Sequence, residues 1–147
     1  MKHVSSKSVD FRKLQILDLY VLFPAFLKRL KFPNELRSKR KIAEAIEDPY
    51  EVLPDPRKLL FELTELHKVS IKYLYAKGII VSTNAELEEV QLVGENIPVD
   101  LNNALDSDSV KNEEWFRLLV DDISKLDVDG KNGLKHRSGL MEHRYDA

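Results

Sequence analysis

One long helix between Asp55 and Gly78 is the feature of this sequence that most constrains the fold. Asp55 is a good N-cap, Pro56 suits the first helical position, and Gly78 supplies a left-handed C-terminal cap. About 22 residues of helix make a rod about 33 Å long. We expect this helix to bury one apolar stripe. The stripe consists of Leu59, Leu60, Leu63, Leu66, Ile71, Tyr73 and Leu74.

A second apolar segment, residues 16–27, has to be distinguished from a signal peptide or a membrane span. It is shorter than the roughly 20 residues that a hydrocarbon layer of about 30 Å requires. Asp18 interrupts it, and no small-residue cleavage site follows it. We therefore predict a core helix that begins near Asp10, with a kink or break at Pro24 that opens a second short helix.

Three further segments complete the helical part of the prediction. Residues 35–46 combine the apolar side chains of Leu36, Ile42, Ala43, Ala45 and Ile46 with interleaved Arg and Lys, which is typical of a short amphipathic helix with its basic side outward, stopped before Pro49. Residues 97–109 form a polar connection, and a last helix starts near Asn112. That helix is expected to bury Trp115, Leu118, Leu119, Ile123 and Leu126. The tail is expected to dock through Leu134, Leu140, Met141 and Tyr145.

A small β-ribbon is predicted directly after the long helix. Residues 79–81 are β-branched, and residues 90–92 supply a partner strand beyond a turn at residues 82–84. The rival interpretation is a short helix, because Thr83 and Glu86 have capping-box spacing.

The composition favours one folded domain. A chain of 147 residues with 43% hydrophobic and 33% charged residues is globular and of single-domain size. We predict one domain over residues 1–147, predominantly helical and of the α+β class. Helices followed by a ribbon favour a winged-helix-like arrangement. The chain has no cysteine, which is compatible with a reducing compartment, and we expect a cytoplasmic protein that does not contact a membrane.

Charge is unevenly distributed along the chain although the net charge is only -2. Residues 28–41 contain seven basic side chains against Glu35, and residues 86–122 contain eleven acidic ones against Lys111 and Arg117. The basic segment could neutralise phosphates, but a ribbon with an acidic tip would repel DNA. A free-standing winged-helix DNA-binding regulator is therefore the alternative function and not the first choice.

The sequence contains partial matches to metal-binding and phosphate-binding motifs, but none has the ligand spacing that the motif requires. Residues 127–130 hint at a calcium loop, but Lys125 and His136 then fall where acidic ligands belong. The four histidines never pair at the spacing of a zinc-binding helix, and the glycines form no phosphate-binding loop. We expect a protein that is not an enzyme and that needs no cofactor or metal.

Three segments together resemble a known family: residues 9–24 (VDFRKLQILDLYVLFP), 49–55 (PYEVLPD) and 139–146 (GLMEHRYD). They resemble the small middle components of bacterial ABC three-component systems, which include the accessory subunit of Lamassu anti-phage defence. The positions carried over as fold or interface residues are Leu17, Asp18, Tyr20, Phe23, Pro24, Leu53, Pro54, Arg144 and Tyr145.

The resemblance implies a non-catalytic accessory subunit of an anti-phage or anti-plasmid defence complex. Its partners would be an SMC or Rad50-like ATPase with a coiled coil and a nuclease effector, and DNA would be contacted through the assembled complex. Candidate contacts to a partner or to nucleic acid are Asp18, Arg29, Arg37, Lys39, Arg40, Lys41 and Arg144.

Overall fold

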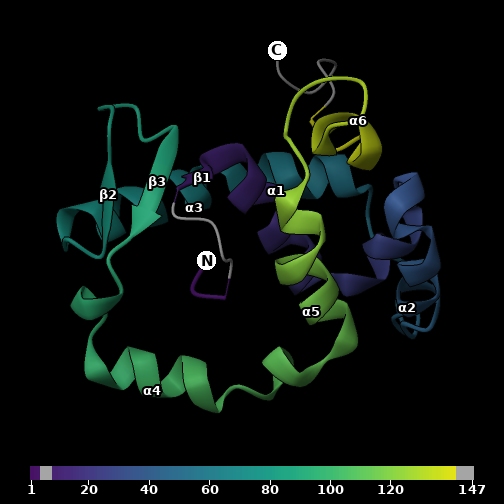
Figure 1. Ribbon diagram of the computed structural model, residues 1–147, viewed down its shortest axis with the longest axis horizontal. Coiled ribbons are helices and arrows are strands. Elements are labelled where there is room, and N and C mark those ends of the chain that lie inside the picture. The colour runs from purple at the N-terminus through teal and green to yellow at the C-terminus, as the bar shows by residue number, and fades with distance from the viewer. Residues whose placement is uncertain (4–7, 142–147) are drawn as a thin grey trace.

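The computed structural model describes residues 1–3 and 8–141 of the chain. Its helices and strands follow one another as shown in Figure 1. They are β1 (Val9–Asp10), α1 (Phe11–Leu22), α2 (Arg40–Glu44), α3 (Pro56–Ala76), β2 (Ile80–Ser82), β3 (Glu89–Leu92), α4 (Val99–Ser107), α5 (Glu114–Asp121) and α6 (Leu134–Ser138). Short 3-10 turns connect several of them, at Pro24–Arg29, Asn34–Lys39, Gly94–Asn96, Ser109–Asn112 and Ile123–Lys125.

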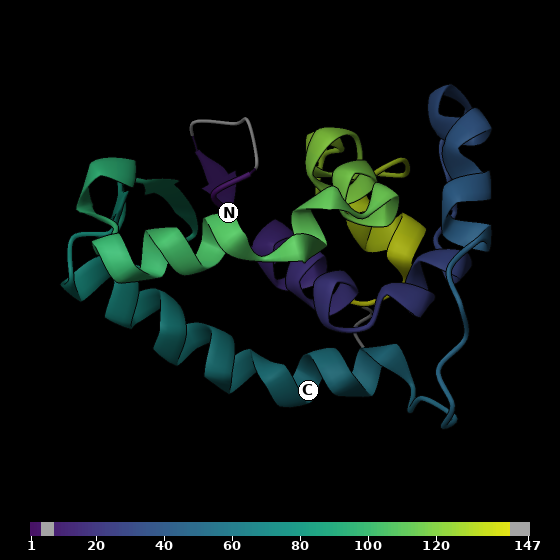
Figure 2. The ribbon, with the colours of Figure 1, turned by 90° about the horizontal axis from the view of Figure 1, so that it is seen from below.

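The ends of α3 confirm the prediction from its capping residues. The side chain of Asp55 accepts a hydrogen bond from the backbone N–H of Arg57, Pro56 is the first helical residue, and Gly78 has a φ of 73°. The predicted buried stripe is wrong for Leu66 and Tyr73, which are exposed. The reason is visible in Figure 2, where α3 runs along one edge of the molecule and the described elements lie on one side of it.

The first helix also begins and ends where its sequence predicts. Asp10 caps α1 by accepting from the backbone N–H of Arg12, and Pro24 opens a separate 3-10 turn after α1 has ended at Leu22. The main core forms where this segment packs against α5 and the C-terminal part of the chain. Its completely buried apolar side chains are Ile16, Leu19, Leu27, Ala43, Ile123 and Leu134.

The β-ribbon is confirmed, and it is larger than predicted. β2 and β3 pair antiparallel with Ile80 opposite Leu92, and β1 adds a third strand through Val9 opposite Val90. The strand order is therefore β1-β3-β2. A second, smaller core lies beneath this sheet, around Ile71 and Leu87. The predominantly helical α+β class is confirmed, and the winged-helix arrangement stays a prediction.

Residues 97–109 are not the plain connection that their polarity predicts, because they contain α4. This helix shows most of its side chains to solvent and forms an arc along the lower edge of Figure 1. The side chain of Lys2 donates to the side-chain oxygen of Asn102 at 2.6 Å and also pairs with Asp106. These contacts connect the N-terminal residues to α4.

The C-terminal elements complete the main core. α5 buries Phe116, Leu118, Leu119 and Val120, while Trp115 is only half-buried. Leu134 and Leu140 are buried as predicted, Met141 packs against the same core, and Tyr145 lies outside the described residues. The backbone N–H of Lys31 donates to the carbonyl oxygen of Arg137 at 3.0 Å, and the guanidinium of Arg137 donates in turn to the carbonyl oxygen of Lys31. None of the described helices has the length and hydropathy needed to cross a membrane.

Candidate functional site

The outward side of α3 is the first candidate surface. Five large apolar or aromatic side chains on this helix are half or more exposed: Phe61, Leu66, Val69, Tyr73 and Tyr75. On the inward side, only Leu60 and Ile71 are buried. Clusters of exposed large apolar side chains mark interaction sites when they are contiguous, whereas single ones need no explanation. α3 therefore has more apolar surface than the described part of the chain covers.

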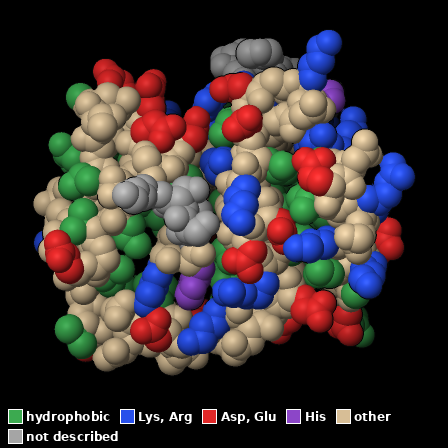
Figure 3. All heavy atoms as spheres, in the orientation of Figure 1, with side chains coloured by type: hydrophobic (Ala, Val, Ile, Leu, Met, Phe, Trp, Pro, Cys, Tyr) green, Lys and Arg blue, Asp and Glu red, His purple; other side chains and the backbone are tan. Residues whose placement is uncertain are grey.

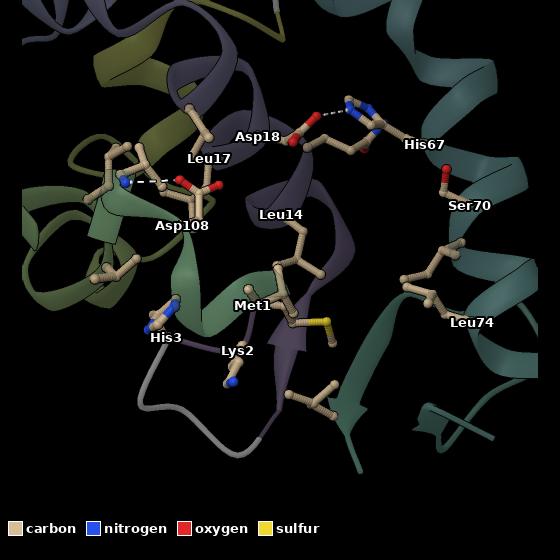
Figure 4. A pocket seen from close by; sticks show the side chains of 18 of the residues that line it. Met1, Lys2, His3, Leu14, Leu17, Asp18, His67, Ser70, Leu74 and Asp108 are labelled. Atoms are coloured by element: carbon tan, nitrogen blue, oxygen red, sulfur yellow. Dashed lines mark hydrogen bonds and ion pairs between the residues drawn. The ribbon is translucent and has the colours of Figure 1, made fainter. Parts of the chain in front are cut away.

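An apolar cavity of about 510 Å³ lies on the inward side of α3, between this helix and α1, α4 and α5. Leu14, Leu74 and Met1 point into it in Figure 4, and Leu101 and Leu105 of α4 also line it. Burial lowers the pKa of the Met1 amine, and the nearby charge of Asp18 opposes that shift. The first residue of the chain is thus part of the cavity wall.

Asp18 was a candidate contact because it interrupts an apolar helix, and the structure gives it a partner inside the chain. Oδ2 of Asp18 lies 2.8 Å from Nε2 of His67, at the edge of the cavity (Figure 4). Because a carboxylate only accepts hydrogen bonds, the proton of this bond belongs to Nε2. Nδ1 of His67 is buried and has no hydrogen-bond partner among the described residues. Asp18 therefore connects α1 to α3.

The candidate basic residues lie on α2 and on the two turns that precede it. Arg29 stacks over the ring of Phe26 at 5.3 Å and is otherwise exposed. Arg37 and Lys41 are exposed as well. In Figure 3 the Lys and Arg side chains gather on the half of the face that holds α5 and α2, interspersed with Asp and Glu. The surface there is of mixed charge.

Two of these basic side chains are paired within the chain. Nζ of Lys39 lies 2.7 Å from Oδ2 of Asp122, and Nε of Arg40 lies 3.3 Å from Oε1 of Glu44. The structure therefore brings the basic residues of α2 and its turns together but leaves Asp18 apart from them, on the wall of the cavity. Arg144, the remaining candidate, lies outside the described residues.

The segment that hinted at a calcium loop is held by ion pairs. Both carboxylate oxygens of Asp129 accept from the guanidinium of Arg12, at 3.0 and 2.9 Å. The hydrogen bond from Arg12 lowers the pKa of Asp129. Among the described residues, no group of three or more His, Asp or Glu side chains is placed to hold a metal ion.

Comparison with known proteins identifies the family. The family model described as ABC-three component (ABC-3C) system Middle Component 5 matches residues 1–146. The chain belongs to this family. No curated protein and no solved structure matches it significantly.

Membership in the Middle Component 5 family confirms the resemblance drawn from three sequence segments, whereas the link to Lamassu stays a prediction. A middle component of a three-component system implies partner components. Of the positions that the resemblance carried over, Leu17 and Tyr20 are buried and Phe23 and Leu53 pack against the main core. Those four residues are therefore part of the core packing of this Middle Component 5 chain.

Sequence reasoning missed both the exposed side of α3 and the cavity. The sequence did contain a signal for the exposed side of α3. Phe61, Val69 and Tyr75 add apolar residues outside the expected stripe, so that α3 is apolar on more sides than one core contact can cover. The sequence contained no signal for the cavity, because the cavity depends on how α4 and the N-terminal residues of the Middle Component 5 chain are placed in space.

Proposed function

We propose that this chain is a non-catalytic accessory subunit of an ABC-three component defence system, in which it holds an SMC or Rad50-like ATPase and a nuclease effector in one complex. The observation that carries the proposal is the match of residues 1–146 to a middle-component family. ATP hydrolysis and DNA cleavage would then belong to the partners, and this chain would supply binding surfaces.

The surface of α3 supports an assembling role. Leu66, Val69 and Tyr73 remain more than half exposed, and no described segment of the chain packs over them. Burying such side chains against a partner is favourable because apolar area is removed from water. A subunit that acts by binding needs a surface of this kind.

In this proposal DNA is contacted by the assembled complex and not by this chain alone. A free-standing regulator would need unpaired cations along its DNA-binding face, yet Lys39 and Arg40 are paired with carboxylates of the same chain. Arg37 and Lys41 remain available for an anionic surface of a partner or for DNA held by that partner.

The proposal is tested in cells that carry the complete system. Deleting only the gene for this chain should abolish protection against phage or plasmid, and expressing the chain from a second locus should restore it. Protection that persists at full strength in the deletion strain would contradict the proposed role. A strain that lacks the whole system provides the baseline for unprotected cells.

A further inference from the structure

Three of the five exposed large apolar residues of α3, namely Leu66, Val69 and Tyr73, fall into one heptad register. Residues spaced alternately by three and four positions run along one side of the helix, and we call them the α3 seam: Leu59, Glu62, Leu66, Val69, Tyr73 and Ala76. This spacing is the one with which a helix packs knobs into holes against a second helix in a coiled coil. Five of the six seam residues are apolar or aromatic, and Glu62 is the exception.

The central part of the α3 seam is open to solvent. Leu66, Val69 and Tyr73 are 60%, 64% and 60% exposed, whereas Leu60 and Ile71 on the inward side are buried. Figure 2 shows the described elements on the inward side of α3 only. From Leu59 to Ala76 the seam is about 26 Å long, which is enough for more than two heptads of a partner helix.

The charges beside the α3 seam specify what a partner helix must carry. Beside the C-terminal half of the α3 seam lie Lys72 and, directly after α3, Lys77, and residues 66–77 contain no acidic residue. Lys68 lies further round the helix, with Nζ 3.7 Å from Oε1 of Glu65. Lys77 also lies over the ring of Tyr73, with Nζ 5.5 Å from its centroid. In coiled coils, the charges that flank the seam select the partner and its orientation. A helix with Glu or Asp at its flanking positions complements this surface.

We propose that the α3 seam binds a helix of another component of the three-component system, by coiled-coil packing, and that this helix has apolar residues at heptad spacing and acidic residues beside them. This inference rests on the proposed function, which supplies the partner. A second copy of the chain packed in parallel is a less suitable occupant, because Lys72 of α3 and Lys77 directly after it would then face the same lysines of the other copy.

Tyr73 and Tyr75 offer a matched pair of test positions. They are the same residue type on the same helix and are 60% and 50% exposed, but they point in directions about 160° apart around the helix axis. Only Tyr73 belongs to the α3 seam. The variants Tyr73→Glu and Tyr75→Glu therefore make the same chemical change on and off the proposed contact.

The experiment co-expresses each variant with the two other components encoded in the same system, and it measures how much of them a tagged copy of this chain retains. Tyr73→Glu is expected to weaken retention of one component by about tenfold or more, as for a residue central to an interface, whereas Tyr75→Glu retains it as the unmodified chain does. Leu66→Glu should reproduce the loss. Thermal melting of each isolated variant shows whether the fold is kept.

Three results would overturn the inference. One is that Tyr73→Glu and Leu66→Glu both keep their fold and retain the partner as well as Tyr75→Glu does. A second is that the isolated chain is a dimer in sedimentation and that Tyr73→Glu converts it to a monomer, because the seam would then bind a second copy. A third is that Tyr73→Glu and Leu66→Glu melt far below Tyr75→Glu, because the seam would then serve the fold of this chain.

Failure of the proposed function would give a different result: the unmodified chain itself would retain neither of the other two components.

Cross-linking keeps the test independent of any loss of stability. The chain has no cysteine, so the single-cysteine variants Tyr73→Cys and Tyr75→Cys each carry one maleimide-linked photo-crosslinker. Tyr73→Cys is expected to cross-link to a heptad segment of the partner, with Tyr75→Cys giving at most a tenth of that yield; equal yields from the two positions would contradict the seam contact.

Discussion

Asp18 on α1 and His67 on α3 form a 2.8 Å hydrogen bond at the edge of the cavity. The bond connects the first helix of the main core to the long helix at the edge of the molecule. His67 is the more enclosed partner, with 11% of its side chain exposed against 47% for Asp18. The contact therefore adds a polar connection between α1 and α3 to the apolar packing of Leu60 and Ile71.

Removing the Asp18 carboxylate should destabilise the chain. We expect Asp18→Ala to lower the free energy of unfolding by about 1 kcal/mol, because the enclosed Nε2 of His67 loses its acceptor. Urea denaturation provides the measurement. Asp48→Ala is the control: Asp48 pairs with Lys28 at 2.8 Å but is 82% exposed, so its loss should cost less than about 0.5 kcal/mol. Equal effects of the two substitutions would show that the Asp18 bond does not stabilise the fold.

His3 should titrate below the ordinary value for histidine. Burial is the largest cause that lowers its pKa, followed by the positive charge of the N-terminal amine, and its ring meets the ring of Phe116 edge-on at 5.5 Å. An NMR titration of the four histidines should place the His3 pKa below 6.5. A His3 pKa at or above 6.5 would contradict the expected effect of burial and neighbouring positive charge on this ring.

The lowered pKa of His3 also sets the sign of its effect on stability. Between pH 6.5 and the lower pKa of the folded state, the unfolded chain binds more protons at His3 than the folded chain does. The contribution of His3 to the free energy of unfolding is therefore complete above pH 6.5, and it decreases as the pH falls through the pKa of the folded state. Urea denaturation of the unmodified chain and of His3→Gln over this range isolates the effect. The unmodified chain should lose stability more steeply as the pH falls.

The basic segment should act through Arg37 and Lys41, which are exposed, and through Arg40, whose solvent-exposed pair with Glu44 is weak enough to be exchanged for another anionic partner. Changing Arg37, Arg40 and Lys41 together to Glu should weaken an anionic contact and leave the fold intact, because exposed substitutions change stability by less than about 0.5 kcal/mol each. Lys39→Glu is the contrast, since it would place a carboxylate beside Asp122 and lower the melting temperature.

The readouts for the triple variant are assembly with the other components and DNA affinity of the resulting complex at several salt concentrations, because contacts to phosphate weaken as salt rises. If both stay at the level of the unmodified chain, the basic segment is not part of the functional surface.

The local parts of the fold could be predicted from the sequence, because their signals lie within a few residues. Asp10 and Asp55 cap helices by accepting from N–H groups two residues away, and Gly78 ends α3 with a positive φ. β1 could not be predicted in this way, because the partner of Val9 is Val90, far along the chain. α4 was missed because its sequence is polar and its side chains bury little.

The candidate site was predictable to a smaller extent. Apolar spacing identifies α3 as a helix that must bury side chains, but it does not tell whether Tyr73 faces this chain or a partner. Similarly, the spacing of Lys39 predicts an exposed cation, and only the folded chain shows Asp122 beside it. The exposure of Tyr73 and the pairing of Lys39 both depend on how segments that are distant in the sequence pack against each other. The family, in contrast, was indicated by sequence alone, since three short segments resembled it and the family model matches residues 1–146.

If this chain joins the other two components, a pull-down of one of them should recover the other only in its presence. The ATPase component is tagged and captured from cells that express all three proteins, and from cells that lack only this chain. We predict that the effector component is recovered with the tagged ATPase when this chain is present and is lost when it is absent. Equal recovery of the effector with and without this chain would contradict the account.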